Sequence, residues 1–233
     1  MKLAVISDLH LGRGDAADPF MHNDEKFNKF LKFLEKNFEK IILLGDIFET
    51  LHSPNFSYSK ELLKCRAAHP KISKRFFEHK KYVYIYGNHD FVAAASPTVK
   101  ETLKIKGNGS DILFLHGHQF SWMTSGRNPI TESAAWLAGW GRRNNFINLT
   151  KSIENKIYYT LGVGINDFKF QKWAINVATK NNANIVVTGH THSATCKQYE
   201  NGMYINSGHC SPKNICFINI DTKNLKFGIN YNY

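Results

Sequence analysis

Residues 3–10 have the sequence Leu-Ala-Val-Ile-Ser-Asp-Leu-His, a buried-strand pattern that ends in two polar side chains, Asp8 and His10. Other short apolar runs are also followed at once by Gly, His, Asp or Asn, and these runs span residues 41–44, 82–86, 112–115 and 185–188. Carboxyl ends of strands in an open α/β sheet converge on one crevice. The sequence therefore predicts an α/β fold in which these polar clusters form one site.

The remaining pattern predicts one domain, 1–233, with a helical insert at about 119–183. Apolar residues at three- and four-residue spacing predict a helix that begins at Asn23 or Asp24. Further helices are expected within 62–77, broken near Pro70, and after Ser96-Pro97 and Asn128-Pro129. The chain end changes character, because 203–206, 215–220 and 225–229 predict strands with no helix between them.

Composition limits the partners and the compartment. The 233 residues carry 30 Lys and Arg against 19 Asp and Glu, a net charge of +11, which favours phosphorylated substrates, nucleic acid or anionic lipid surfaces. A lysine-rich proteome explains the same charge equally well. The chain has no apolar run of membrane-spanning length, opens directly on a strand pattern, and its four cysteines form no CxxC pair. We therefore expect a cytoplasmic protein.

The clusters offer oxygen and imidazole ligands and no thiolate, a set that suits Mn²⁺ first, with Fe²⁺ or Zn²⁺ as alternatives. In an extended segment residues two apart point the same way, so Asp8 and His10 can bind one ion together, as can His190 and His192. Asp46 stands alone in its motif and is the best candidate to bridge two ions. Taken singly, each cluster also fits a turn, a capped loop or a surface pair. Five in order, each at a strand end, predict a two-metal centre.

In order, the motifs Asp8-x-His10, Gly45-Asp46, Gly87-Asn88-His89-Asp90, His116-Gly117 and Gly189-His190-x-His192 resemble those of the calcineurin-like metallophosphoesterase superfamily. The resemblance implies a two-sheet αββα sandwich and a hydrolase in which a hydroxide held between two divalent ions attacks phosphorus. It places one ion on Asp8, His10, Asp46 and His192. It places the other on Asp46, Asn88, His116 and His190.

The same resemblance implies roles for residues outside the ligand set. His89 would donate a proton to the leaving oxygen or stabilise the transferring phosphoryl group, and Asp90 would orient it. We expect substrate contacts from His118, Arg13, Trp140 and Arg143.

Gly45-Asp46-Ile47-Phe48-Glu49 and the insert are similar to the UDP-diacylglucosamine pyrophosphohydrolases of lipid A synthesis. Those enzymes often carry Arg at the position of His89 and an acidic residue at that of His118. From the shared motif and the insert, the similarity implies a lipid-linked pyrophosphate substrate and contact with the inner membrane face. The alternatives are a metal-dependent nuclease and a non-catalytic scaffold of the same fold.

Overall fold

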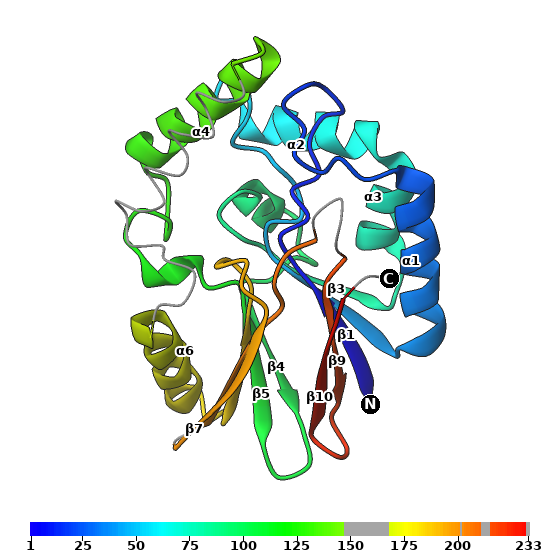
Figure 1. The fold of residues 1–233 in the computed structure, drawn as a ribbon, viewed down its shortest axis with the longest axis vertical. Coiled ribbons are helices and arrows are strands. Elements are labelled where there is room, and N and C mark those ends of the chain that lie inside the picture. Colours follow the sequence, from blue (N-terminus) through cyan, green and yellow to red (C-terminus); the bar gives the residue numbers. More distant parts are fainter. Residues whose placement is uncertain (147–167, 201, 211–214, 232–233) are drawn as a thin grey trace.

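The chain forms two stacked sheets with helices on both outer faces (Figure 1), which confirms the expected αββα sandwich. The computed structural model describes residues 1–146, 168–200, 202–210 and 215–231. The first sheet has the order β10-β9-β1-β2-β3 and the second β4-β5-β6-β8-β7. Strands β1, β2 and β3 run parallel to one another, as do β5, β6 and β8. Their carboxyl ends therefore meet at one end of the sandwich.

The first sheet consists of β1 (Lys2–Ile6), β2 (Lys40–Leu44), β3 (Tyr82–Ile85), β9 (Phe217–Asp221) and β10 (Lys226–Asn230). The second sheet consists of β4 (Thr102–Lys106), β5 (Asp111–Leu115), β6 (Ile185–Thr188), β7 (Thr195–Tyr199) and β8 (Gly202–Asn206). The described helices are α1 (Asp24–Asn37), α2 (Tyr58–Ala68), α3 (Pro70–Glu78), α4 (Pro129–Arg143) and α6 (Phe168–Lys180), with short 3-10 helices at Phe91–Ala95 and His118–Phe120.

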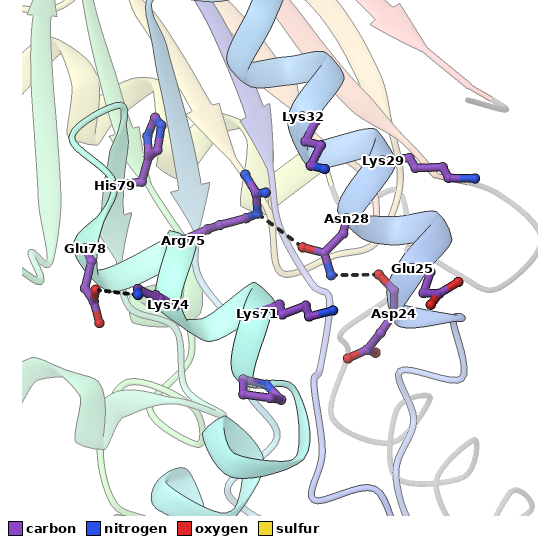
Figure 2. Close-up of a pocket in the computed structure, with 11 residues that line it drawn as sticks. Asp24, Glu25, Asn28, Lys29, Lys32, Lys71, Lys74, Arg75, Glu78 and His79 are labelled. Atoms are coloured by element: carbon purple, nitrogen blue, oxygen red, sulfur yellow. Dashed lines mark hydrogen bonds and ion pairs between the residues drawn. The ribbon is translucent and has the colours of Figure 1, made fainter.

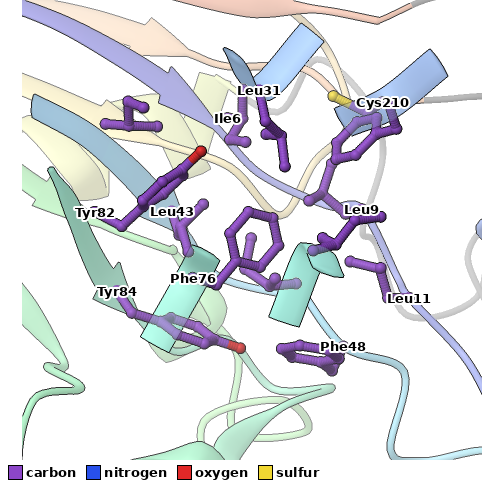
Figure 3. Packing of buried hydrophobic residues seen from close by; sticks show 14 of the residues in the cluster. Ile6, Leu9, Leu11, Leu31, Leu43, Phe48, Phe76, Tyr82, Tyr84 and Cys210 are labelled. Atoms are coloured by element: carbon purple, nitrogen blue, oxygen red, sulfur yellow. The ribbon is translucent and has the colours of Figure 1, made fainter. Parts of the chain in front are cut away.

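Successive side chains point to opposite faces of each central strand, so the buried core is divided into layers. On β1, Leu3 and Val5 pack between the two sheets, whereas Ala4 and Ile6 pack toward the helices. The helix-facing layer continues through aromatic side chains such as Phe76 (Figure 3). Each such side chain contributes about 1.5–3 kcal/mol when it is fully buried. Because both faces of β1 are covered, its side chains are apolar throughout Leu3–Ile6, and polar residues first appear where the strand ends.

Two of the strands were not predicted from the sequence, because their side chains are largely polar. β4 and β7 are the edge strands of the second sheet, and each leaves several side chains exposed. Edge strands commonly carry charged residues, so their hydrophobic signal is weak. The helix expected after Ser96-Pro97 was wrong, since a 3-10 helix at Phe91–Ala95 precedes these residues and strand β4 follows.

The helix expected at Asn128-Pro129 is α4, and the Asn128 side chain caps it by accepting from the amides of Ile130 and Thr131. Within the insert expected at 119–183, α6 packs on the outer face of the second sheet. Residues 147–167 lie outside the described part of the chain. Among the described residues, no helix combines the length and apolarity that crossing a membrane requires.

His69, between α2 and α3, should make the stability of the fold depend on pH. Its Nδ1 and Nε2 lie 2.8 Å from Asp24 Oδ1 and 3.2 Å from Asp18 Oδ2. Burial lowers the pKa of His69, but the two carboxylates outweigh it and the net pKa is raised. The stabilisation is therefore complete below pH ~6.5 and is lost as the pH rises through the folded-state pKa.

We expect His69→Gln to lower the free energy of unfolding by about 1–3 kcal/mol at pH 5.5 and by clearly less at pH 9. Urea denaturation at both pH values measures this, with His79→Gln on the exposed end of α3 as the control. A loss for His69→Gln that is equal at the two pH values would contradict the charged pair.

Candidate metal centre

Backbone hydrogen bonds join four of the five polar clusters into two neighbouring pairs. The amide of Asp8 donates to the carbonyl of Gly45 (3.0 Å), and the amide of His10 donates to that of Asp46 (2.9 Å). In the second sheet, the amide of Gly189 donates to the carbonyl of His116 (3.0 Å). The loops after β1 and β2 are thus tied side by side, as are those after β5 and β6.

The local conformation of the ligand residues differs from the extended one expected from sequence. Five of the predicted ligands have left-handed backbones, with φ of 52° at Asp8, 49° at His10, 52° at Asp46, 65° at His190 and 56° at His192. Non-glycine residues rarely adopt this region, and such strain concentrates at functional sites. Asp8 and His10 therefore both have left-handed backbones at the strand end, and the alternation of an extended strand does not describe this segment.

Three glycines leave space that a side chain would fill. A Cβ on Gly45, whose φ is +84°, would lie 2.3 Å from His116 Nδ1. A Cβ on Gly87 would lie 2.2 Å from Asp46 Oδ1, and one on Gly189 would lie 2.7 Å from Asp8 Oδ2. The motif glycines are therefore required because the ligand side chains pack directly against their backbones.

The ligand atoms of Asp8, His10 and His192 lie within 4.8 Å of one another, as the expected first ion requires. Asp8 Oδ1 lies 3.2 Å from His192 Nε2. The Ser7 hydroxyl donates to Asp8 and lies 2.7 Å from the Ser207 hydroxyl. Asp8 is therefore fixed by its neighbour and by the loop that follows β8.

Asp46, His116 and His190 form a second group of the same size. His116 Nδ1 donates to the carbonyl of Leu44 at 2.8 Å, so its Nε2 is directed toward Asp46. That Nε2 lies 3.1 Å from Asp46 Oδ2, yet it has no partner in hydrogen-bond geometry. His116 Nε2 and Asp46 Oδ2 are therefore close enough to bind one ion together, and they do not form a hydrogen bond with each other. A backbone carbonyl that fixes the tautomer of a ligand histidine is the usual support of a metal site.

Buried polar atoms without hydrogen-bond partners indicate whether the predicted ligand residues are suited to bind metal ions. Among the described residues, five buried side-chain atoms have no hydrogen-bond partner, and three of them are His10 Nε2, Asn88 Oδ1 and His116 Nε2. Leaving a buried polar atom unpaired costs about 1–3 kcal/mol. All three belong to the predicted ligand set, so the donor atoms fit two oxygen- and nitrogen-bound divalent cations.

Glu49 contacts two of the predicted site residues, although the sequence prediction gave it no role. Its buried carboxylate, with 3% of the side chain exposed, accepts from His10 Nδ1 at 3.1 Å and from His89 Nδ1 at 2.8 Å. Both rings therefore keep Nε2 available for other partners. The position of Glu49 in the Gly-Asp-Ile-Phe-Glu motif was visible in the sequence, but its two partners were not.

Asp90 does not orient His89, contrary to the sequence prediction. Its carboxylate instead accepts from the amides of Ile47 (2.7 Å) and Gly87 (2.6 Å) and from the hydroxyl of Tyr84 (2.6 Å). Burial and the charge of Asp46 raise the pKa of Asp90. Asp90 therefore joins the loops after β2 and β3, and Glu49 is the residue that orients His89.

Burial and neighbouring charges together determine the protonation states of the site residues. Burial opposes ionisation of Asp46, but His116 and His89 hold the pKa of this carboxyl well below its usual range. Burial likewise lowers the pKa of His89, but Glu49 and Asp46 raise it to about 10. For His190, burial and then His116 lower the pKa to about 3. Asp46 is thus ionised and His89 protonated, whereas the low pKa of His190 leaves its imidazole neutral, as a ligand must be.

The predicted substrate residues lie at different distances from this centre. His118 is buried beside it, with its ring centroid 5.6 Å from that of His116. Arg13 is paired with Asp15 (3.5 Å) and Glu61 (3.4 Å). Arg143 is also held by Asp15, at 2.7 Å, and by the carbonyl of His52. Trp140 is 44% exposed on α4. The structure therefore brings only His118 to the ligand cluster, whereas the two arginines anchor loops.

Two hollows of the protein differ in whether predicted site residues line them. The larger, about 850 Å³, lies between α1 and α3 and is lined by several lysines, including Lys29, Lys32 and Lys71 (Figure 2). None of its lining residues belongs to the predicted site. The smaller, about 270 Å³, includes Asn88 and His118. The smaller hollow is therefore the one that adjoins the metal-ligand residues.

Comparisons with known proteins identify a family whose sequence pattern this chain shares. The profile of the calcineurin-like phosphoesterase family matches residues 1–194. The UDP-2,3-diacylglucosamine hydrolase of Blochmanniella pennsylvanica is 25% identical over 211 residues, which cover 82% of this chain and 79% of that protein. Among solved structures, the E. coli phosphoesterase Yfce is 15% identical with a TM-score of 0.45 and covers 99% of this chain and 98% of its own. Vps29 of Chaetomium thermophilum is 12% identical with a TM-score of 0.48, over 100% and 94%.

Glu49→Gln should test the positioning of His10 and His89. Glutamine keeps the size of the side chain but cannot accept equally from both rings, so we expect turnover to fall about 10–100-fold and metal affinity to weaken. Calorimetric Mn²⁺ titration measures affinity independently of activity, and Glu49→Asp should restore part of it. The exposed Glu78→Gln is the control. Normal Mn²⁺ affinity and turnover in Glu49→Gln would refute the positioning role.

Proposed function

Because this chain belongs to the calcineurin-like phosphoesterase family, it is a phosphoester hydrolase, and we propose that its substrate is a lipid-linked nucleotide pyrophosphate of the UDP-diacylglucosamine type. The cluster of unpartnered ligand atoms around Asp46 carries the hydrolase assignment. The exposed apolar residues of α4 and the similarity to a UDP-diacylglucosamine hydrolase support the lipid substrate.

The proposed ligands divide between two ions. One ion would be held by Asp8, His10, Asp46 and His192, and the other by Asp46, Asn88, His116 and His190. Mn²⁺ is the proposed metal, with Fe²⁺ and Zn²⁺ as alternatives, because the ligands are carboxylate, amide and imidazole. Such a pair of cations polarises the phosphoryl oxygens and lowers the pKa of water, so that hydroxide is available as a nucleophile near neutral pH.

His89 is the proposed proton donor. Its Nδ1 is held by Glu49, and its side chain is 25% exposed, so Nε2 can reach a substrate at the site surface. As the hydroxide oxygen bonds to phosphorus and the bridging P–O bond breaks, the leaving oxygen would gain the proton of His89 Nε2. General acid catalysis of this kind contributes about 10²–10⁴-fold.

The α4 helix supplies an apolar surface near the site. Ile130, Leu137 and Trp140 are 63%, 37% and 44% exposed. Arg143 ties the end of α4 to the carbonyl of His52, which lies three residues beyond Glu49. Tryptophan and leucine on an exposed helix suit acyl chains or the headgroup boundary of a membrane. The lysine-lined hollow that would favour nucleic acid shares no residue with the site, so the nuclease alternative has less support.

Asp46→Asn should remove a charge shared by both ions. We expect less than one metal per chain by elemental analysis and a loss of turnover of about 10³-fold, or ~4 kcal/mol in activation free energy. Methyl p-nitrophenyl phosphate with Mn²⁺ is the assay substrate, and Asp221→Asn on the surface is the control. Two metals retained with full turnover would exclude Asp46 as the bridge.

Leu137→Ser combined with Trp140→Ser should test the lipid substrate while keeping the Arg143 anchor. We expect hydrolysis of a diacylated UDP-glucosamine in micelles to fall about tenfold, because apolar contact with the acyl chains is lost. Hydrolysis of methyl p-nitrophenyl phosphate should stay unchanged. The exposed Leu63→Ser on α2 is the control. Equal effects on both substrates would show that α4 is only structural.

A further inference from the structure

The hollow of about 270 Å³ beside Asn88 has walls of planar and polar groups. Tyr86 follows β3, and Phe91 begins the 3-10 helix, whereas Arg127 and residues 124–126 come from the segment before α4. Its volume is below the 300–1,000 Å³ typical of pockets for drug-sized ligands. One ring system therefore fits, and a pair of acyl chains does not.

Arg127 is held in place before any ligand arrives. Its Nε and one terminal nitrogen donate to the two carboxylate oxygens of Glu132, each at 3.0 Å. Its guanidinium also lies over the ring of Tyr58, 5.4 Å from the centroid. Because Glu132 already neutralises this charge, Arg127 offers the hollow a fixed planar face. It does not offer a free cation for phosphate.

His118 contributes an unsatisfied polar atom. The residue is 4% exposed, and its Nδ1 has no hydrogen-bond partner among the described residues. It belongs to none of the three close groups of possible metal ligands among the described residues. Its ring lies 5.7 Å from that of Tyr86, and its carbonyl accepts from the Thr124 hydroxyl at 2.7 Å. The imidazole is therefore fixed in the wall of the hollow with a nitrogen that lacks a partner.

We propose that this hollow binds the nucleobase of the substrate, which rests on the proposed function. A nucleobase is planar, so it can stack on the rings of Tyr86 and Phe91, and its edge carries donors and acceptors for polar side chains. Glu101, the one carboxylate that lines the hollow, accepts from a ring N–H. Asn88 lines the hollow and is also a proposed metal ligand, so the base lies next to the phosphate that reacts.

Three diesters with the same p-nitrophenyl leaving group test this assignment. They retain thymidine, glucose or methyl on the phosphate, so only the retained group differs. For the Mn²⁺-loaded protein we expect kcat/KM to be about tenfold higher for the thymidine diester than for the methyl diester. Phe91→Leu should reduce this ratio about tenfold, and Glu101→Gln should reduce it a fewfold. Phe56→Leu and Glu78→Gln lie outside the hollow and are the matched controls.

Binding provides a readout that does not depend on turnover. Calorimetry with thymidine 5′-monophosphate and methyl phosphate should show tighter binding of the nucleotide, and Phe91→Leu should remove that difference. Equal binding of the two, or a preference for the glucose diester, would overturn the nucleobase assignment. Hydrolysis of no diester would refute the proposed function, while tighter nucleotide binding would still support the nucleobase site.

Discussion

The arrangement of the site depends on the burial of one carboxylate, that of Asp46, among imidazoles from both sheets. Asp46 and His89 follow β2 and β3 in the first sheet, whereas His116 and His190 follow β5 and β6 in the second. A buried carboxylate is costly unless charge and hydrogen bonds compensate it, and His116 and His89 do so here. The loops can approach Asp46 closely only because Gly45 and Gly87 carry no Cβ. The same geometry leaves ligand atoms without protein partners, so the arrangement is completed by cations.

Strand periodicity predicted that the polar clusters would gather at one end of the sheets, whereas the layer order and the proposed division of ligands between two ions were implied by the resemblance to the metallophosphoesterase superfamily. Each ligand motif stands at the end of a buried run, and parallel strands bring those ends together. The orientation of His89 could not be predicted, since Glu49 and Asp90 are both nearby carboxylates and only the three-dimensional path of the loop decides between them. The left-handed backbones of Asp8 and His10 could not be predicted either, because secondary-structure propensities do not identify strained residues.

The two ends of the proposed substrate would meet different surfaces. The hollow beside Asn88 is small and lined by polar and planar groups, whereas α4 presents exposed apolar side chains. Both lie on segments adjoining the metal-ligand loops, since residues 124–127 immediately precede α4 and Arg143 anchors its end to Asp15. An amphiphilic substrate therefore matches the distribution of polarity around the centre better than a uniformly polar polymer does.

The position of β9 beside β1 affects the order in which the first sheet can form. β1 pairs with β2 and also with β9, although the register partners Val5 and Ile218 are far apart in the sequence. The Ser7–Ser207 contact that helps to fix Asp8 likewise joins distant segments. Closing such long loops carries a conformational entropy cost, so pairings of this kind form slowly. The surroundings of Asp8 are therefore expected to be completed late in folding, after the more local pairing of β1 with β2.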